Sequence, residues 1–176
     1  MVIRPGVAYF TRVPPQAGDR MTNDIHFAVT LHAAPGAILN ALMFEQEIRR
    51  WWTVAVDIDP TGHGIFAWDG YGWRVHLDMA RDDAARAVRW TCTQSNMQDT
   101  DAWEGTHIDF VVTPQTEGCR LDFRQSGYRD SPCRDVCDGG WRYFIGTSLK
   151  RYLETGKGLP YPETLDTRSE ASSLNP

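Results

Sequence analysis

In three of the strands expected in this chain, the row of inward-facing apolar residues ends in a polar residue. Extending the apolar alternation of each strand leads to Glu104, Gln125 and Gln94. If the alternation holds, these side chains meet near one end of the sheet, beside Trp103. A mostly apolar site with a few converging hydrogen-bonding groups is what the binding of a small molecule requires. The alternative is that the strand ends run into solvent, because a shift of one residue turns every side chain to the opposite face.

Glu104 is the one candidate acid or base of this group. Surrounded by tryptophan rings, its carboxyl group could transfer a proton to or from a substrate. An enzyme of the cyclase or dehydratase kind would use it in this way. However, Gly105 follows it at the entrance of a strand, where a solvated carboxylate or one that caps the backbone is more common. Catalysis through Glu104 is therefore a hypothesis that stays open beside binding without a reaction.

The five histidines favour neither a metal centre nor a catalytic one. His63 falls in a glycine-containing loop over residues 61–64. The other four fall on the polar phase of their strands, facing away from the expected core: His26, His32, His76 and His107. The sequence contains neither an HExxH motif nor a GxSxG nucleophile elbow. We therefore expect surface histidines, no metal and no cofactor.

The four cysteines form no CxxC pair of the kind that holds zinc. Their spacing is typical of reduced thiols, which favours a cytoplasmic protein. Cys133 and Cys137 lie four residues apart and would share one face of a helix if the long C-terminal helix begins early. Packed or exposed thiols are the favoured interpretation there, ahead of a disulfide or a metal site.

Composition indicates an ordinary folded domain. Of 176 residues, 41% are hydrophobic and 23% are charged, with a net charge of −5. A basic cluster is lacking, which argues against nucleic acid as a partner. The longest apolar runs fall far short of the roughly 20 residues that a membrane span requires, and the first residues do not form the apolar core of a secretory signal. Seven tryptophans need either a thick core or a cavity to line, and core filling is the favoured role for most of them.

One long amphipathic helix is predicted over residues 137–156. Its apolar stripe recurs at helical period, in Trp141, Phe144, Ile145, Leu149, Tyr152 and Leu153. Asp138 is the expected cap of its first turn and Gly156 its left-handed stop. A stripe this bulky needs a sheet to lie against.

The remaining periodic segments alternate as strands. We expect them over 25–32, 64–68, 72–79, 86–93, 104–113 and 119–126, with hairpins at Asp69-Gly70 and at residues 116–118. Two short helices follow the first strand, beginning at residues 34–36. The predicted fold class is α+β: a curved antiparallel sheet of about six strands, wrapped around one long C-terminal helix.

The domain is expected to span residues 21–161. Residues 1–20 are rich in proline and glycine and are expected to form a loosely ordered extension, so that Met21 is an alternative start to Met1. Residues 162–176 are expected to form a disordered polar tail.

The order and spacing of several short motifs resemble the START-like or SRPBCC superfamily, and within it the branch named after the activator of the heat-shock-protein-90 ATPase. The similarity extends from about Ile25 to Tyr161 and is carried by Trp51-Trp52, Trp103-Glu104-Gly105-Thr106, Gly118, Gly127, Gly140-Trp141, Ser148-Leu149-Lys150, the run 153–158 and Pro160-Tyr161. The resemblance implies a helix-grip fold with an internal cavity between the sheet and the C-terminal helix. It implies no shared catalytic residue.

Relatives of this kind bind apolar molecules such as lipids or polyketides, and some are cyclases or co-chaperones. The leading hypothesis is therefore the binding of an apolar or aromatic small molecule by a monomer or homodimer. The candidate walls are Trp73, Trp90, Trp103, Phe110, Phe123 and Phe144, with Glu104 and Gln125 as polar anchors. A protein-interaction module of the co-chaperone type is the further alternative, although the chain lacks room for the separate chaperone-binding domain that such co-chaperones carry.

Overall fold

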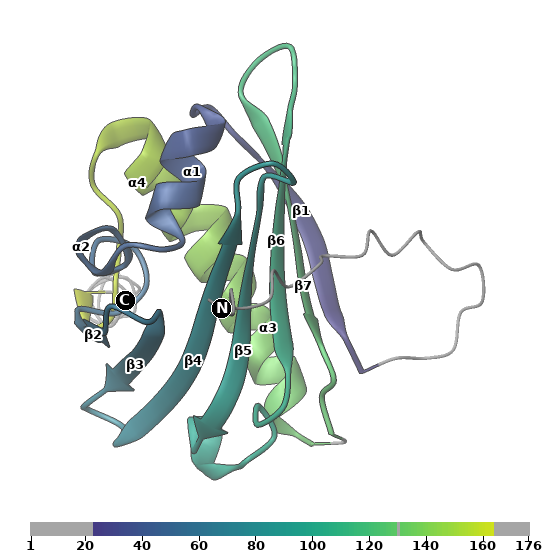
Figure 1. Ribbon diagram of the computed structural model, residues 1–176. Coiled ribbons are helices and arrows are strands. Elements are labelled where there is room, and N and C mark those ends of the chain that lie inside the picture. Colours follow the sequence, from purple (N-terminus) through teal and green to yellow (C-terminus); the bar gives the residue numbers. More distant parts are fainter. Residues whose placement is uncertain (1–22, 130, 164–176) are drawn as a thin grey trace, which may run out of the picture.

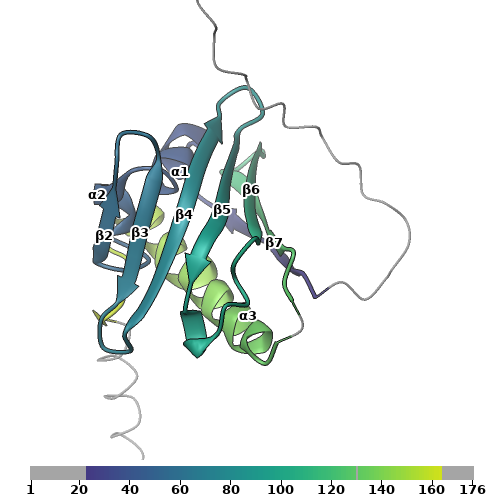
Figure 2. The same cartoon turned by 60° about the horizontal axis from the view of Figure 1, so that its bottom comes forward.

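The computed structural model describes residues 23–129 and 131–163, which form a curved sheet with all the main helices on its concave side (Figure 1). The extension predicted over 1–20 lies outside the described residues, and so does the predicted tail beyond residue 163. A view turned by 60° shows the C-terminal helix crossing the concave face diagonally (Figure 2). The α+β class and the wrapped helix are confirmed.

The sheet has seven strands, one more than expected, and each is antiparallel to its neighbours. Their spatial order is β1-β7-β6-β5-β4-β3-β2. Their bounds are β1 (Ile25–Leu31), β2 (Ala55–Ile58), β3 (His63–Trp68), β4 (Trp73–Asp82), β5 (Ala87–Ser95), β6 (His107–Pro114) and β7 (Cys119–Ser126). The strand that the sequence did not predict is β2, whose four residues are too few to show an alternation.

The C-terminal helix is a single rod built from three consecutive pieces. These are α3 (Cys133–Tyr143), the π-helical η2 (Phe144–Leu149) and α4 (Lys150–Thr155). Gly156 ends it with a φ of 79°, as predicted. Asp138 does not cap its start: the helix begins five residues earlier, and the Asp138 carboxylate instead pairs with Arg142 at 2.9 Å. The early start brings Cys133 onto the same helix as Cys137.

The shorter helices lie in two of the connections between strands. α1 (Pro35–Ala41) and α2 (Glu45–Ile48) follow β1, and the 3-10 turn η1 (Met97–Asp99) follows β5. Proline at the first position of α1 suits its start, because the missing N–H would have no partner there.

The two faces of the sheet differ as the alternation predicts. On β6 the residues Ile108, Phe110 and Val112 are buried against the helices. On the convex face Asp109 accepts a hydrogen bond from Arg89 of β5 at 2.6 Å, which forms a cross-strand pair. The core therefore lies entirely between the concave face and the helices.

A bulge in β5 changes the phase of that strand near its end. His76 pairs with Gln94, but the next residue of β4, Leu77, pairs with Cys92, so Thr93 is extra. Thr93 and Gln94 are both exposed, and Ser95 is the next buried residue. The expectation that Gln94 points inward is therefore wrong, because two residues instead of one separate the inward positions.

Side chains of the C-terminal helix tie it to the free edge of β1. Lys150 Nζ donates to the carbonyl of Thr30 at 2.9 Å, and the backbone N–H of His32 donates to Glu154 Oε1 at 3.0 Å. Thr30 lies on β1, which is the last strand at this side of the sheet, and His32 directly follows it. The helix thus satisfies part of a sheet edge that would otherwise be open. Among the described helices, none is both long and apolar enough to cross a membrane.

Candidate functional site

A row of aromatic rings fills the space between the sheet and the C-terminal helix. The ring of Trp52, which follows α2, lies 5.2 Å from each of the rings of Trp68, Trp90 and Trp141. Trp141, on α3, lies in turn 5.5 Å from Trp103. The planes of Trp52 and Trp141 differ by 25° and those of Trp141 and Trp103 by 20°, so three indoles stack nearly parallel. We call Trp52, Trp141 and Trp103 the indole row.

Hydrogen bonds fix the neighbouring tryptophans to the first helices. Trp51 Nε1 donates to the carbonyl of Ala41 at 2.8 Å, and Trp90 Nε1 donates to that of Leu42 at 3.0 Å. Both carbonyls lie at the end of α1, where no further helical turn uses them. These bonds hold α1 against the rings.

Gln125 is the polar centre of this interior, and its inward direction agrees with the alternation of β7. Its side chain is fully buried at the inward end of β7. Its amide Nε2 donates to Thr106 Oγ1 at 3.0 Å, and its Oε1 accepts from the Tyr128 hydroxyl at 2.8 Å and from Trp141 Nε1 at 2.7 Å. Burial of the Tyr128 hydroxyl raises its pKa, so it stays protonated and acts as a donor.

Every buried side-chain nitrogen or oxygen within the described residues has a hydrogen-bond partner. The Gln125 amide carries two hydrogens on Nε2, and the described residues accept one of them. No acceptor among the described residues lies within hydrogen-bond distance of the second. A largely apolar interior with one amide donor in reserve can orient a ligand that carries a single acceptor.

Glu104 lies outside the strand in which it was expected. It belongs to a turn before β6, where Gly105 adopts a φ of 79°, and it is half-buried. Its Oε1 accepts the backbone N–H of Ser95 at 3.2 Å. The alternative of a backbone-capping carboxylate is therefore the one that the structure shows.

The other predicted wall residues divide into a buried group and a marginal group. Phe110 and Phe123 are buried with their rings 5.5 Å apart. Trp73 and Phe144 are only partly buried. Trp73 stacks on Tyr71 at 4.3 Å, and Tyr71 is 48% exposed, so this pair lies at the margin of the sheet.

Sequence reasoning missed three members of the site. Trp141 was assigned only to the helix stripe, Trp52 only to a motif, and Tyr128 was not considered. The signal for Trp141 was present, because a residue that leads a buried stripe must face the inward end of the strands. Trp52 and Tyr128 lie on connections, where no periodicity indicates direction.

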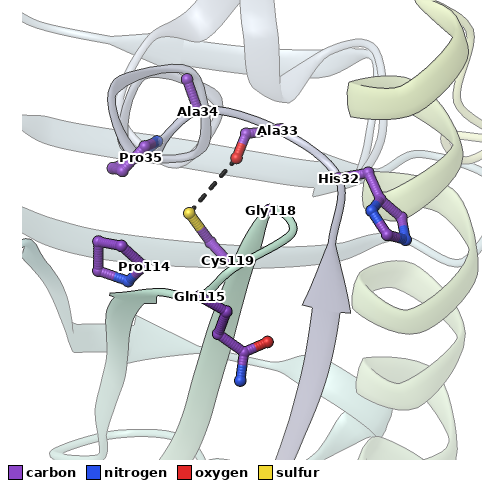
Figure 3. Close-up of a pocket in the computed structure, with 8 residues that line it drawn as sticks. All are labelled: His32, Ala33, Ala34, Pro35, Pro114, Gln115, Gly118 and Cys119. Atoms are coloured by element: carbon purple, nitrogen blue, oxygen red, sulfur yellow. Dashed lines mark hydrogen bonds between the residues drawn. The ribbon is translucent and has the colours of Figure 1, made fainter.

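An open pocket of about 590 Å³ lies away from this interior, where the β6–β7 hairpin meets the start of α1 (Figure 3). Its lining includes Pro35, Pro114, Gln115 and Gly118. Cys119 Sγ contacts the carbonyl of Ala33 across it at 3.3 Å. It has no group of charged side chains that would define a ligand.

The described residues contain no group of three or more His, Cys, Asp or Glu side chains that could hold a metal ion. Their four cysteines are all buried free thiols, as favoured from the sequence for Cys133 and Cys137. The histidines at positions 26, 32 and 107 are exposed. His63 opens β3 instead of lying in a loop, and its Nδ1 is 2.7 Å from Asp78 Oδ1 on the outer face.

Sequence comparison identifies one family. The model for the family described as "Activator of Hsp90 ATPase homolog 1-like protein" matches residues 32–154. No curated protein matches the chain in sequence.

Several solved structures share the fold. The Aha1 dimer from Colwellia psychrerythraea is 22% identical with a TM-score of 0.65, and the match covers 77% of this chain and 98% of that one. SSP2350 from Staphylococcus saprophyticus is 14% identical with a TM-score of 0.58, covering 77% and 94%. DynU16, from the dynemicin biosynthetic locus, is 18% identical with a TM-score of 0.56, covering 77% and 49%.

Proposed function

Since the chain belongs to the family of Activator of Hsp90 ATPase homolog 1-like proteins, we propose that it uses the helix-grip fold to bind a flat apolar or aromatic small molecule between the sheet and the C-terminal helix. The observation that supports the proposal is the indole row, whose middle ring, Trp141, is hydrogen-bonded to the buried amide of Gln125. A flat aromatic molecule could stack on these rings in the offset arrangement that aromatic pairs prefer. The second hydrogen on Gln125 Nε2 could donate to an acceptor on that molecule and so fix its orientation. The fold's occurrence in DynU16, from a biosynthetic locus, is consistent with a small-molecule role.

The small molecule enters when the C-terminal helix moves. Trp52, Trp141 and Trp103 already touch one another, so a bound molecule must take the place of one ring or separate two. Trp141 is the ring that can move, because it lies on the helix and the π-helical η2 begins three residues later. A π-helical turn is a frequent feature of functional sites and gives a helix a place to change its winding.

The geometry favours binding over catalysis. Glu104 caps the backbone of Ser95 and does not point from a strand into the interior. Buried Gln125 and Tyr128 supply hydrogen bonds but no group that gains or loses a proton readily near neutral pH. The site is therefore equipped to recognise a molecule and hold it.

Titration with the uncharged fluorophore phenylnaphthylamine tests the proposal. We expect saturable quenching of tryptophan emission at one probe per chain. Replacing the central ring in Trp141→Phe should weaken binding by roughly tenfold, since aromatic pairs contribute about 0.5–1.5 kcal/mol. Trp73→Phe is the matched control and should bind as the wild type does, because Trp73 stacks on Tyr71 at the margin.

A native mass spectrum of the protein purified from its own host gives a second readout. We expect a retained small molecule, and the same spectrum counts the copies of the chain per particle, which tests the expectation of a monomer or homodimer. No retained molecule together with no saturable quenching would refute the proposal. Equal weakening in Trp141→Phe and Trp73→Phe would place binding elsewhere.

A further inference from the structure

Two thiols face each other at the start of the C-terminal helix. Cys133 is the first residue of α3, Cys137 lies one turn further on, and their Sγ atoms are 2.9 Å apart. A disulfide bond is about 2.05 Å long, so the sulfurs need to approach by less than about 1 Å. Residues four apart in an α-helix have Cα atoms about 6 Å apart, which lies inside the range that a disulfide spans. The Cβ atoms of such residues are about 5–6 Å apart in a regular helix and must come within about 4.5 Å, so the first turn of α3 has to distort when the bond forms.

The surroundings of the pair shift the pKa values of the two thiols in opposite directions. The hydrogen bond from the Cys137 thiol lowers the pKa of Cys133 to about 7, in spite of burial, and contacts with Thr100 and Trp103 act in the same direction. The pKa of Cys137 is raised because its proton is held by Cys133 and because it is buried. The positive end of the helix dipole favours a thiolate at the same place. Near neutral pH Cys133 is therefore the sulfur that ionises more readily, and Cys137 is the one that keeps its proton.

We propose that Cys133 and Cys137 form an oxidation site, at which hydrogen peroxide converts the dithiol into a disulfide within the helix. The Cys133 thiolate attacks one peroxide oxygen, the O–O bond breaks, and the departing hydroxide takes up a proton to leave as water. The Cys137 sulfur then attacks the sulfenic acid on Cys133, the S–O bond breaks, and the Cys137 proton leaves with the hydroxyl group as a second water. Two thiols are oxidised by two electrons and one peroxide is reduced.

The fold restricts which oxidants and which thiols take part. Cys133 is 3% and Cys137 is 6% exposed, so bulky disulfides are excluded and an oxidant that reaches the sulfurs must be as small as peroxide. The other two cysteines stand alone. Burial raises the pKa of Cys92 to about 12 and also raises that of Cys119, which keeps both protonated and slow to react. A neighbouring thiol also stops the reaction at the disulfide, which is reversible, before sulfinic acid forms.

The oxidation site touches the indole row. Trp103 Nε1 donates to Cys137 Sγ at 3.2 Å, and the Trp103 ring stacks on Trp141. When the sulfurs approach, the acceptor of the Trp103 indole moves. Oxidation should therefore change tryptophan emission, whether or not the interior binds a ligand.

Trypsin provides a direct test on the full chain, because it cuts after Arg134 and separates Cys133 from Cys137. After peroxide treatment and alkylation of the remaining thiols, we expect peptides 130–134 and 135–142 joined by a disulfide. The intact mass should fall by two hydrogens, two of the four cysteines should stay alkylatable, and dithiothreitol should restore all four. Cys119→Ser, at a lone buried cysteine, is the matched control and should behave as the wild type does.

The variants of the pair distinguish the two roles. Cys133→Ser should lose the reaction, while Cys137→Ser should gain oxygen on Cys133 and form no disulfide. The peptide map of the wild type decides the matter even if a variant fails to fold. Four alkylatable thiols after peroxide, oxygen added without a cross-link, or a cross-link that involves Cys92 or Cys119 would each overturn the proposal.

Discussion

The indole Nε1–H of Trp141 donates to Oε1 of Gln125 at 2.7 Å, and this bond joins the C-terminal helix to β7 inside the core. The same oxygen accepts from the Tyr128 hydroxyl, which follows β7 in the chain. A single amide thus satisfies polar groups from a helix and a connection, while its nitrogen satisfies Thr106. The sheet is therefore joined to the helix by buried hydrogen bonds as well as by apolar packing, and the loss of these bonds can be measured.

Gln125→Leu should destabilise the protein. The substitution keeps much of the volume but leaves the Trp141 N–H and the Tyr128 and Thr106 hydroxyls without their partner. Each buried group left unpaired costs about 1–3 kcal/mol, so we expect the free energy of unfolding in urea to fall by at least about 2 kcal/mol. Gln115→Leu makes the same change at an exposed position and should shift it by less than about 0.5 kcal/mol. Equal effects would show that Gln125 is not a structural centre.

The position of Gln125 was predictable because the pairing of β7 is regular. From Leu121 through Phe123 every second residue is inward, and no bulge interrupts the ladder to β6. The buried positions Trp141, Ile145 and Leu149 of the C-terminal helix were also predictable, since they recur every four residues, although the last two lie in the π-helical η2. Regular backbone lets a sequence pattern fix the direction of a side chain.

Gln94 and Glu104 were misplaced where the backbone departs from regularity. One extra residue at the β5 bulge turned Gln94 outward, and the left-handed Gly105 put Glu104 in a turn. The start of the C-terminal helix was misplaced because Asp138, a favoured capping residue, was expected to begin it, whereas α3 begins at Cys133 directly after Pro132. Contacts between distant segments, such as that between Trp103 and Cys137, leave no trace in local periodicity.

Gly118→Ala should weaken the β6–β7 hairpin. Gly118 has a φ of 75°, and a Cβ atom there would collide with the backbone of Leu31. The left-handed conformation alone costs a non-glycine residue about 1–2 kcal/mol, so we expect a loss of stability of at least that size. Gly36→Ala is the contrasting control: Gly36 lies in α1 with open space around it, and alanine should stabilise the helix by about 0.5–1 kcal/mol. In thermal unfolding, we expect the midpoint temperature to fall for Gly118→Ala and to rise for Gly36→Ala. A shift in the same direction for both variants would contradict the argument.

Stability should depend on pH through Cys133. Its pKa is lowered from 9.0 to about 7 in the folded protein, so folding favours the thiolate. The resulting stabilisation is absent below pH 7, grows as the pH rises from 7 to 9, and would be complete above 9. The raised pKa of Cys137 acts in the opposite direction above pH 9, where the unfolded chain loses a proton that the folded protein keeps.

The measurement is urea unfolding of the reduced protein compared with Cys133→Ser. We expect the difference in unfolding free energy to rise between pH 7 and 9, by up to roughly 1.4 kcal/mol per pH unit. It should flatten or reverse above pH 9. A difference that does not change across this window would show that the pair holds no thiolate.

Ser148→Ala should lower stability and tighten ligand binding at the same time. Ser148 Oγ donates to the carbonyl of Trp51 at 2.6 Å and accepts the N–H of Leu159 at 2.8 Å, so it fastens the C-terminal helix to the segments on either side of it. Its loss leaves one buried and one partly buried backbone group unpaired and costs about 1–3 kcal/mol. If the guest enters only when the helix moves, the apparent affinity is limited by the population of the moved state, and loosening the helix raises that population.

The affinity for phenylnaphthylamine should therefore increase by roughly fivefold or more, since about 1.4 kcal/mol corresponds to tenfold, while the urea midpoint falls. Thr147→Ala, at an exposed position of the same segment, should change neither quantity. A rigid, preformed site predicts the opposite result, because a loosened wall can only lose contacts with the probe. Weaker or unchanged binding in a folded Ser148→Ala variant would thus rule out entry by helix movement, even if the wild type binds the probe.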